Sequence, residues 1–374
     1  MNPQPLAGKI VKALFCASLF AATLELSARV DAAWRWGAPF WGPYSMETLR
    51  VTDELGTRNR PNARFEKWVI NSAGFRGPEL SMTKPAGVIR VGIAGASEIF
   101  GLYESPEKHL TAQLQALLET AQPGRFEVVN LASAGMSPPR IRELFERWAH
   151  RFDFDVIVFY PTPVFYLDID PPRRTQPPMA SSETGDSRRL SLRLPDKVWK
   201  ALRERLPARL KSSLKRAEIQ RERSGHPPGW VWSSPPPERV TRFASDLEEL
   251  IQTFRQAEVR VVLATHAHRF SAVLTEEDLA QMEGWIRFNP RATAECLLEM
   301  ERQANEIVRR IGRERGVPVV DTQKAVGKDP RHYADFSHLT DEGATRAARA
   351  LADQILTQSM EARLSQGSKI PAGH

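Results

Sequence analysis

Three residues of the kinds that together make an activated serine nucleophile stand in two stretches far apart in the chain. Ser97 follows a short apolar run, in Gly95-Ala96-Ser97, and Asp335 and His338 stand three residues apart near the C-terminus. A serine hydroxyl is a poor nucleophile until a base removes its proton, and a carboxylate orients that base and stabilises its charged form. The pattern predicts Ser97 as nucleophile, His338 as base and Asp335 as the orienting group.

The same stretches predict donors for a developing oxyanion. Ser97 would lie in a sharp turn from a strand into a helix, where its own N–H points toward such a charge. Gly135, in Leu131-Ala-Ser-Ala-Gly135, could offer a second N–H. Each motif alone has a plainer interpretation, because Gly-x-Ser is often only a turn and Asp-x-x-His is often a helix cap. Their combination and order favour a catalytic site.

An alternation of short apolar runs and amphipathic segments sets the expected fold. The apolar runs predict five strands, at residues 88–94, 126–131, 155–160, 259–265 and 317–321. Helical spacing predicts helices at residues 106–120, 139–150, 240–257, 292–315 and 341–358. Strands that are apolar almost throughout and alternate with helices indicate an α/β protein whose parallel sheet is covered on both faces.

The candidate residues cluster where such a sheet binds ligands. Open parallel sheets bind ligands at the carboxyl ends of their strands. Ser97, Gly135, Thr162, His266 and the Asp335–His338 stretch all follow predicted strands. We therefore expect them at one edge of the sheet.

Two histidines after the fourth predicted strand are further candidates. His266 and His268 are expected to line a substrate site or to serve structurally. Two histidines without a nearby cysteine or carboxylate in sequence are a weak case for a metal site. We expect no metal or organic cofactor.

The N-terminus has the pattern of a membrane-targeting segment. Lys9 and Lys12 precede an apolar stretch at 13–24, and the following residues add Glu25 and Arg29. A full span needs ~20 apolar residues. We favour an uncleaved anchor in the cell membrane with the body facing the periplasm or exterior. A cleaved signal peptide and an amphipathic helix packed on a soluble protein are the alternatives.

A basic insert separates the third strand from the rest of the sheet. Residues 171–224 hold 15 Lys and Arg against 6 Asp and Glu, so the remainder of this +7 chain carries a net charge of −2. A helix at 196–223 would place leucines on one face and basic residues on the other. It could lie on an anionic membrane surface or pack on the core. No nucleic-acid recognition motif accompanies the charge, so we expect no nucleic-acid partner.

The predicted organisation has four parts. Residues 1–33 form the anchor or signal segment, and residues 34–85 an aromatic extension. Residues 86–360 form the α/β domain, which carries the Pro-rich basic insert at 171–237. Residues 361–374 are expected to be a flexible tail. The sequence leaves the oligomeric state open.

The motifs together resemble the SGNH (GDSL-like) hydrolase superfamily, and the envelope-anchored arrangement resembles members that act on acylated polysaccharides. The resemblance covers residues 70–358. It rests on Gly95-Ala96-Ser97, on Gly135, and on Asp335-Phe-Ser-His338, with Asn71-Ser-Ala-Gly-Phe-Arg-Gly77 and His338-Leu-Thr-Asp-Glu-Gly343 as flanks. It implies a flavodoxin-like three-layer sandwich and the Ser97/His338/Asp335 triad.

The chain departs from that pattern at two places. Ala96 replaces the usual Asp, and no Asn stands in Tyr160-Pro-Thr-Pro-Val-Phe-Tyr-Leu-Asp168, where the family has an oxyanion donor. Thr162 or Asn71 is the candidate substitute. Loss of one such donor costs ~10²–10³ in rate.

Two functions follow from these features. The first is an SGNH-type serine esterase or O-acyltransferase that works through an acyl-enzyme on an acylated glycan or another ester. The second is a catalytically degenerate protein of this fold that binds glycan or assembles with polysaccharide machinery. A lipid esterase at the membrane surface is a weaker third reading, suggested by the basic insert.

Overall fold

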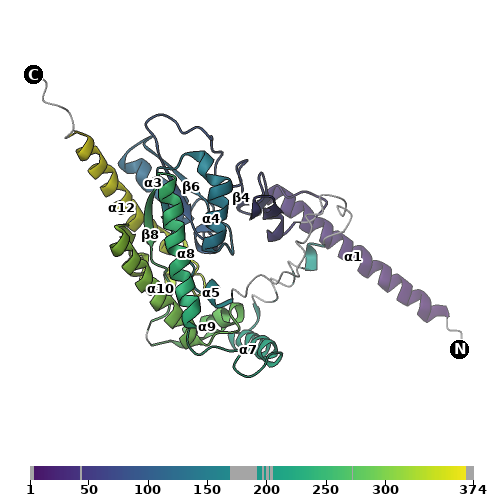
Figure 1. Cartoon of the computed structure of the whole chain (residues 1–374). Helices are drawn as coiled ribbons and strands as arrows, with labels where there is room; N and C mark the ends of the chain where they lie inside the picture. Colours follow the sequence, from purple (N-terminus) through teal and green to yellow (C-terminus); the bar gives the residue numbers. More distant parts are fainter. Residues whose placement is uncertain are drawn as a thin grey trace, which may run out of the picture.

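A computed structural model describes residues 4–42, 44–168, 192–195, 198, 202, 205–271 and 273–367 (Figure 1). At its centre is a five-stranded parallel sheet of β5 (Ile89–Ala94), β6 (Phe126–Asn130), β7 (Val156–Phe159), β8 (Arg260–Ala264) and β9 (Val319–Val320). The strand order is β6-β5-β7-β8-β9, and every neighbouring pair is parallel. In chain order this is 2-1-3-4-5, the flavodoxin-like arrangement. The predicted fold class is confirmed.

Alternating side chains of the central strands build two separate cores. In β7, Ile157 and Phe159 join one apolar cluster with α4 (Pro138–Arg147), α8 (Pro237–Gln256) and α10 (Ala294–Arg315). Val156 and Val158 join the other cluster, with α3 (Leu110–Ala121) and α12 (Asp341–Gly367). Successive residues of a strand point to opposite faces of a sheet. The apolar runs are therefore continuous because both faces are covered.

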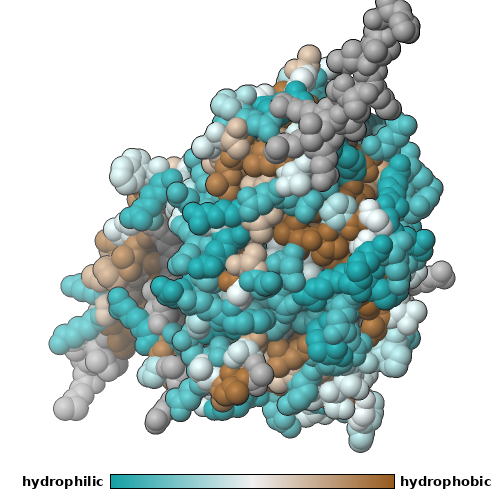
Figure 2. All heavy atoms as spheres, turned by 90° about the vertical axis from the view of Figure 1, so that its left-hand side faces the viewer, coloured by the Kyte–Doolittle hydropathy of each residue, from teal (hydrophilic) through white to brown (hydrophobic). Residues whose placement is uncertain are grey.

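One outer face of the molecule is largely polar. The face shown in Figure 2, the left-hand side of Figure 1, is mostly hydrophilic with scattered apolar residues. α10 accordingly buries one side, which includes Met300, Ala304 and Val308, and pairs charged residues on the other, as Arg302 does with Glu299 and Glu306. This is the pattern of a helix that covers a sheet from one side.

Several predicted helix boundaries shift by a few residues, and capping explains two of them. The helix predicted at 106–120 begins at Leu110, because the side chain of His109 accepts a hydrogen bond from Ala112 N. The helix predicted at 292–315 begins at Ala294, where Thr293 caps Cys296 N at 3.3 Å. The helix predicted at 139–150 ends at Arg147 and is followed by the 3₁₀ turn Ala149–Phe152.

The N-terminal segment is one helix, α1 (Gln4–Trp36), which projects away from the sandwich (Figure 1). Its part from Gly8 to Trp36 is long and apolar enough to cross a membrane or to serve as a signal sequence. Glu25 and Arg29 form an ion pair at 2.7 Å, and Glu25 accepts hydrogen bonds from the backbone N–H groups of Arg193 and Leu194. The charged pair that interrupts the apolar stretch therefore binds the backbone of the basic insert at Arg193 and Leu194.

The extension at 34–85 contains two short hairpins. They are β1 (Arg50–Asp53) with β2 (Gly56–Asn59), and β3 (Arg64–Phe65) with β4 (Trp68–Val69). Trp34 and Trp41 are exposed, whereas Trp68 is buried against the α/β domain. The extension thus contributes two buried aromatic residues, Trp68 and Phe75, to the domain and leaves others at the base of α1.

The described part of the basic insert includes α7 (Ala208–Ser224), which packs on α9 (Glu276–Phe288). Ion pairs join Arg216 to Glu283 and Arg287 to Glu218. The helix predicted at 196–223 is thus described as a helix from Ala208, after Pro207, and most of 196–204 lies outside the described residues. Leu210 and Leu214 are exposed.

The chain ends in α12, which continues to Gly367. Residues 361–367 of the expected tail are therefore helical, and residues 368–374 lie outside the described part of the chain.

Replacing Gly343 in α12 with alanine is expected to destabilise the protein by ~1–3 kcal/mol. A Cβ there would overlap the carbonyl oxygen of His332 and lie 3.0 Å from its carbonyl carbon. Backbone atoms cannot rotate away, so α12 or the segment before His338 must move. Urea unfolding measures the loss. Gly225→Ala is the control, since a Cβ there meets only Glu222 O at 3.4 Å; an equal loss in both variants would contradict the prediction.

Candidate active site

The predicted nucleophile stands on a tight turn at the carboxyl end of the central strand. β5 ends at Ala94, and the short helix α2 (Ser97–Phe100) begins three residues later. Gly95 permits this turn, because a Cβ there would lie 2.6 Å from Ile99 Cγ1 and 3.0 Å from the Tyr160 carbonyl oxygen. Ser97 is partly exposed, whereas its neighbours on both sides are buried. The fold therefore presents the Ser97 hydroxyl at the surface of the sheet edge.

The extension braces the far end of that turn. Trp68 Nε1 donates a hydrogen bond to Gly101 O at 3.1 Å. The buried guanidinium of Arg76 donates to Gly101 O at 2.6 Å and also to the Phe100 carbonyl. These contacts satisfy carbonyl groups at the C-terminal end of α2, which a four-residue helix leaves without internal partners.

The Asp335–His338 loop reaches the same edge from the other end of the domain. A bridge between Tyr333 and Leu339 closes its base. Phe336 packs on the buried Trp285 of α9, with ring centroids 5.4 Å apart. Asp335 Oδ1 accepts from the backbone N–H of His338 at 3.0 Å and so fixes the turn. The loop is therefore held by packing and by its own carboxylate.

The geometry of His338 suits a general base. Its Nδ1 lies 2.8 Å from Asp335 Oδ2 and 3.0 Å from Oδ1. Its Nε2 is buried and has no hydrogen-bond partner among the described residues. Burial lowers the pKa of His338, but the bond to Asp335 and the negative charges of Glu98 and Glu104 outweigh burial and raise it.

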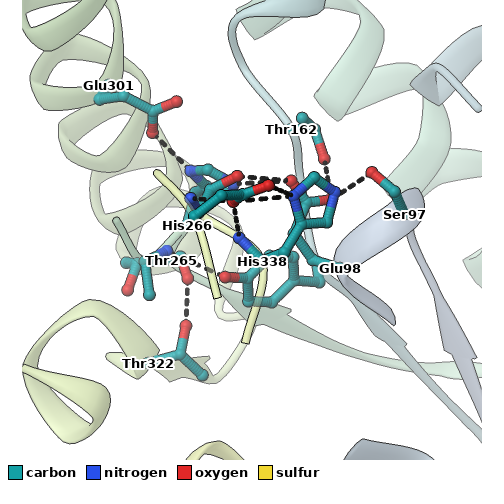
Figure 3. Close-up of polar contacts among 12 residues, drawn as sticks. Ser97, Glu98, Thr162, Thr265, His266, Glu301, Thr322 and His338 are labelled. Atoms are coloured by element: carbon teal, nitrogen blue, oxygen red, sulfur yellow. Dashed lines mark hydrogen bonds and ion pairs between the residues drawn. The ribbon is translucent and has the colours of Figure 1, made fainter. Parts of the chain in front are cut away.

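Ser97 and His338, far apart in sequence, approach each other across this edge. Figure 3 shows the Ser97 hydroxyl pointing toward the His338 ring and toward Glu98. The hydrogen bond that Ser97 Oγ makes here is to Glu98 Oε2, at 3.4 Å. Catalytic hydrogen bonds are often long before substrate binds. The catalytic roles of Ser97, His338 and Asp335 remain predictions, now with a geometry that allows them.

A buried carboxylate that motif reasoning did not single out lies directly behind the nucleophile. Glu98 is 2% exposed and accepts hydrogen bonds from Thr162 Oγ1 at 3.0 Å and Ser337 Oγ at 3.1 Å. His266 Nε2 lies 3.4 Å from its Oε1. Burial raises the pKa of Glu98, but the His266 hydrogen bond and the positive charges of His338 and His266 lower it to about 2.

His266 joins Glu98 to a second buried carboxylate. Its Nδ1 lies 2.7 Å from Glu301 Oε2, and both side chains are fully buried (Figure 3). Burial lowers the pKa of His266, but the charges and hydrogen bonds of Glu301 and Glu98 raise it to about 10. His266 is therefore an imidazolium at neutral pH. With both ring nitrogens occupied and no exposed surface, His266 fits the structural one of the two roles predicted for it.

The other predicted substrate-binding residues are also engaged within the protein. Asn71 accepts from Ala73 N and Phe75 N and donates to Pro78 O, so it holds its own loop. The Thr162 hydroxyl donates to Glu98. His268 is buried beside Lys328 Nζ, and burial lowers its pKa well below the ordinary value. These positions favour structural roles for all three.

The predicted second oxyanion donor keeps an accessible position. Gly135 is exposed with φ of +78°, in a turn that Met136 N closes onto Ser133 O. Arg50 of the extension donates to the neighbouring Ala134 carbonyl at 2.5 Å. The assignments of Ser97 N–H and Gly135 N–H to the oxyanion remain predictions.

Two local features of the sequence foreshadow the buried carboxylates. Glu98 is the single charged residue between Val91 and Phe100. Glu301 falls on the apolar stripe of its helix, beside Met300 and Ala304. A charge inside an apolar pattern needs a buried partner. No local sequence pattern shows which residue is the buried partner of Glu98 or of Glu301.

Among the described residues, no group of three or more His, Cys, Asp or Glu side chains is arranged to hold a metal ion.

Comparisons with known proteins identify structural likenesses only. No family model and no curated protein matches the chain. A lipase/acylhydrolase from Enterococcus faecalis is 12% identical with a TM-score of 0.42, covering 72% of this chain and 97% of that one. A catalytic mutant of an acetylxylan esterase from Geobacillus stearothermophilus is 13% identical with a TM-score of 0.42, covering 73% and 96%. A GDSL-like lipase from Bacteroides thetaiotaomicron is 9% identical with a TM-score of 0.40, covering 75% and 93%.

Proposed function

We propose that this protein is a serine-dependent acyl-ester enzyme of SGNH type. The observation that carries the proposal is the geometry of His338, whose Nδ1 is held by Asp335 at 2.8 Å while its Nε2 faces the partly exposed Ser97 without another hydrogen-bond partner among the described residues. Ser97 Oγ attacks the ester carbonyl and transfers its proton to His338 Nε2. The imidazolium protonates the departing alkoxide, which leaves an acyl-enzyme on Ser97.

The second half of the reaction resolves the acyl-enzyme. His338 removes a proton from water, which gives hydrolysis, or from a sugar hydroxyl, which gives acyl transfer. Water and a sugar hydroxyl need the same base and the same oxyanion donors. Which of the two the pocket admits therefore decides between hydrolysis and acyl transfer. We propose an acylated cell-envelope or secreted glycan as the substrate, from the motif resemblance and the membrane-type N-terminal helix.

The test is turnover of small and polymeric acetyl esters by the purified full-length chain. Release of p-nitrophenol from p-nitrophenyl acetate and of acetate from acetylated xylan, together with fluorophosphonate labelling of Ser97, would support the proposal. Added acceptor sugars would then separate hydrolysis from transfer by mass spectrometry of the acylated products. A chain that is folded but neither labelled nor active on any ester would overturn it.

We further propose that α1 anchors the protein in the cell membrane, with the sandwich on the periplasmic or exterior side. Its apolar segment Gly8–Trp36 meets the length of a span. The intact mass of protein extracted from membranes tests retention of α1. A mass that lacks about the first 32 residues would show a cleaved signal peptide, which needs ~15–30 residues.

A specific observation favours the second candidate, a degenerate binding protein. Tyr160-Pro161-Thr162-Pro163 holds no Asn, and the Thr162 hydroxyl donates to Glu98 at 3.0 Å, so it does not point freely to an oxyanion. This leaves Ser97 N–H and Gly135 N–H as the assigned donors. Binding of acetylated xylan by a chain that no fluorophosphonate labels would favour this candidate.

A further inference from the structure

Glu98 connects four loops at the carboxyl edge of the sheet. Its carboxylate contacts Ser97 from its own turn, Thr162 from the loop after β7, and His266 from the loop after β8 (Figure 3). It also accepts a hydrogen bond from Ser337 of the His338 loop. Both predicted partners of proton transfer, Ser97 and His338, thus border one buried carboxylate. No part of the triad mechanism requires this group.

The cluster around Glu98 has an unusual charge for a fully buried site. The His266 ring stands between two buried acidic side chains, Glu98 and Glu301, so two carboxyl groups share one imidazole. Burying an unbalanced charge costs free energy, and well-packed neutral groups of similar size are often as stable or more so. His266 with one carboxylate would stabilise the fold better than His266 with both Glu98 and Glu301. The second carboxylate therefore points to a role other than stability.

One of these two acidic side chains, Glu98, also lies next to the base. Among the described residues, four titratable groups face His338: Asp335 from its own loop, Glu98 from α2, and Tyr103 and Glu104 from the segment after α2. Asp335 occupies Nδ1, and Tyr103 packs against the ring with centroids 5.2 Å apart. Glu98 is the fully buried carboxylate on the side of Nε2 and Ser97 (Figure 3). Glu301 lies beyond His266, away from His338.

We infer that Glu98, held by His266 and Glu301, is a positioning residue that orients the Ser97 hydroxyl and stabilises the imidazolium of His338 during proton transfer. The inference rests on the proposed esterase function. In the resting enzyme Ser97 donates to Glu98, and on attack its proton passes to His338 Nε2. The new positive charge then lies between two carboxylates, Asp335 on the Nδ1 side and Glu98 on the other. His266 keeps Glu98 ionised and immobile.

The experiment compares the matched variants Glu98→Gln and Glu301→Gln. Each substitution replaces one carboxyl group that contacts His266 with an amide of similar size and leaves the other carboxyl group as its partner, so both variants are expected to fold. The His338 pKa is measured by NMR titration of the full-length, histidine-labelled chain in detergent, with His338→Gln for assignment. Thermal unfolding checks the fold of each variant.

We expect the His338 pKa to fall in Glu98→Gln and to stay near the wild-type value in Glu301→Gln. In kinetics, the acidic limb of kcat/KM moves to lower pH in Glu98→Gln only. The kcat falls about tenfold with KM unchanged, a smaller loss than the ~10²–10⁴ that general-base catalysis itself contributes. A purely structural role would change the stability of both variants and shift neither titration.

Equal titration of His338 in wild type and Glu98→Gln, or equal shifts in both variants, would overturn the inference. If Glu98→Gln fails to fold, the double variant Glu98→Gln/Glu301→Gln, which leaves a neutral His266 between two amides, must show the same lowering of the His338 pKa. The NMR readout needs no turnover. A shifted His338 in a chain without ester activity would therefore reject the proposed function while the electrostatic link between Glu98 and His338 stands.

Discussion

Ser97→Ala is expected to reduce kcat/KM for acetyl esters on the order of 10⁴- to 10⁶-fold, because no acyl-enzyme can form without the hydroxyl. His338→Ala is expected to reduce kcat/KM by a similar factor, since no base then takes the proton of the Ser97 hydroxyl. Both variants should bind substrate, so the loss appears in kcat. Steady-state turnover of p-nitrophenyl acetate measures both.

Non-additivity gives this prediction its sharpest form. When catalytic residues act as one unit, replacing the first of them already removes nearly all of the rate enhancement that they provide together. The double variant Ser97→Ala/His338→Ala should therefore be no slower than either single variant. Ser137→Ala is the control, because that serine precedes α4 and makes no side-chain capping hydrogen bond. Activity of Ser97→Ala equal to wild type would remove the nucleophile assignment and make the binding protein the leading candidate.

His266→Ala is expected to lower the free energy of unfolding by ~3–5 kcal/mol. The substitution leaves Glu98 and Glu301 buried without the cation between them, and it opens a cavity at a fully buried position. Urea unfolding followed by circular dichroism measures the loss. His150→Ala, at an exposed histidine, should cost under ~1 kcal/mol. A loss of similar size in both variants would contradict the charged network.

The contribution of this network to stability depends on pH in a predictable direction. His266 has its pKa raised from 6.5 to about 10, so its contribution is complete below pH 6.5 and is lost as pH rises toward 10. Glu98 has its pKa lowered from 4.5 to about 2, so its contribution is complete above pH 4.5 and is lost as pH falls toward 2. The difference in stability between wild type and His266→Ala should be greatest between pH 4.5 and 6.5. A difference that grows steadily above pH 7 would contradict this assignment.

Most of the central sheet could be predicted because its determinants are local. The runs that contain Val91 to Ala94 and Val156 to Phe159 are apolar at every position, which marks strands covered on both faces. The long helices were recognisable from the spacing of residues such as Leu247, Leu250 and Phe254. Boundaries shifted where a cap intervened, as at His109, because a histidine is not among the common capping residues.

Elements that depend on distant partners were missed. The helix α9 has a weakly amphipathic sequence, and its Trp285 is buried because Phe270 and Phe336 stack on it. The hairpins between Arg50 and Val69 are short and only half-buried, so neither alternation nor length marks them. Arg76 and Trp68 were placed in an extension, yet they brace the turn of the nucleophile.

The sequence by itself determined the strands and the long helices. It also predicted that Ser97 and the Asp335–His338 loop share one edge of the sheet, because open parallel sheets bind ligands at the carboxyl ends of their strands. Only the tertiary structure decided which buried side chains surround Ser97 and His338. His266 lies 35 residues from Glu301 and 168 from Glu98, and Ser337 lies 239 from Glu98. Hydrogen bonds and ion pairs act over a few ångströms in space, whatever the separation along the chain. Their partners become known only when the layers are packed.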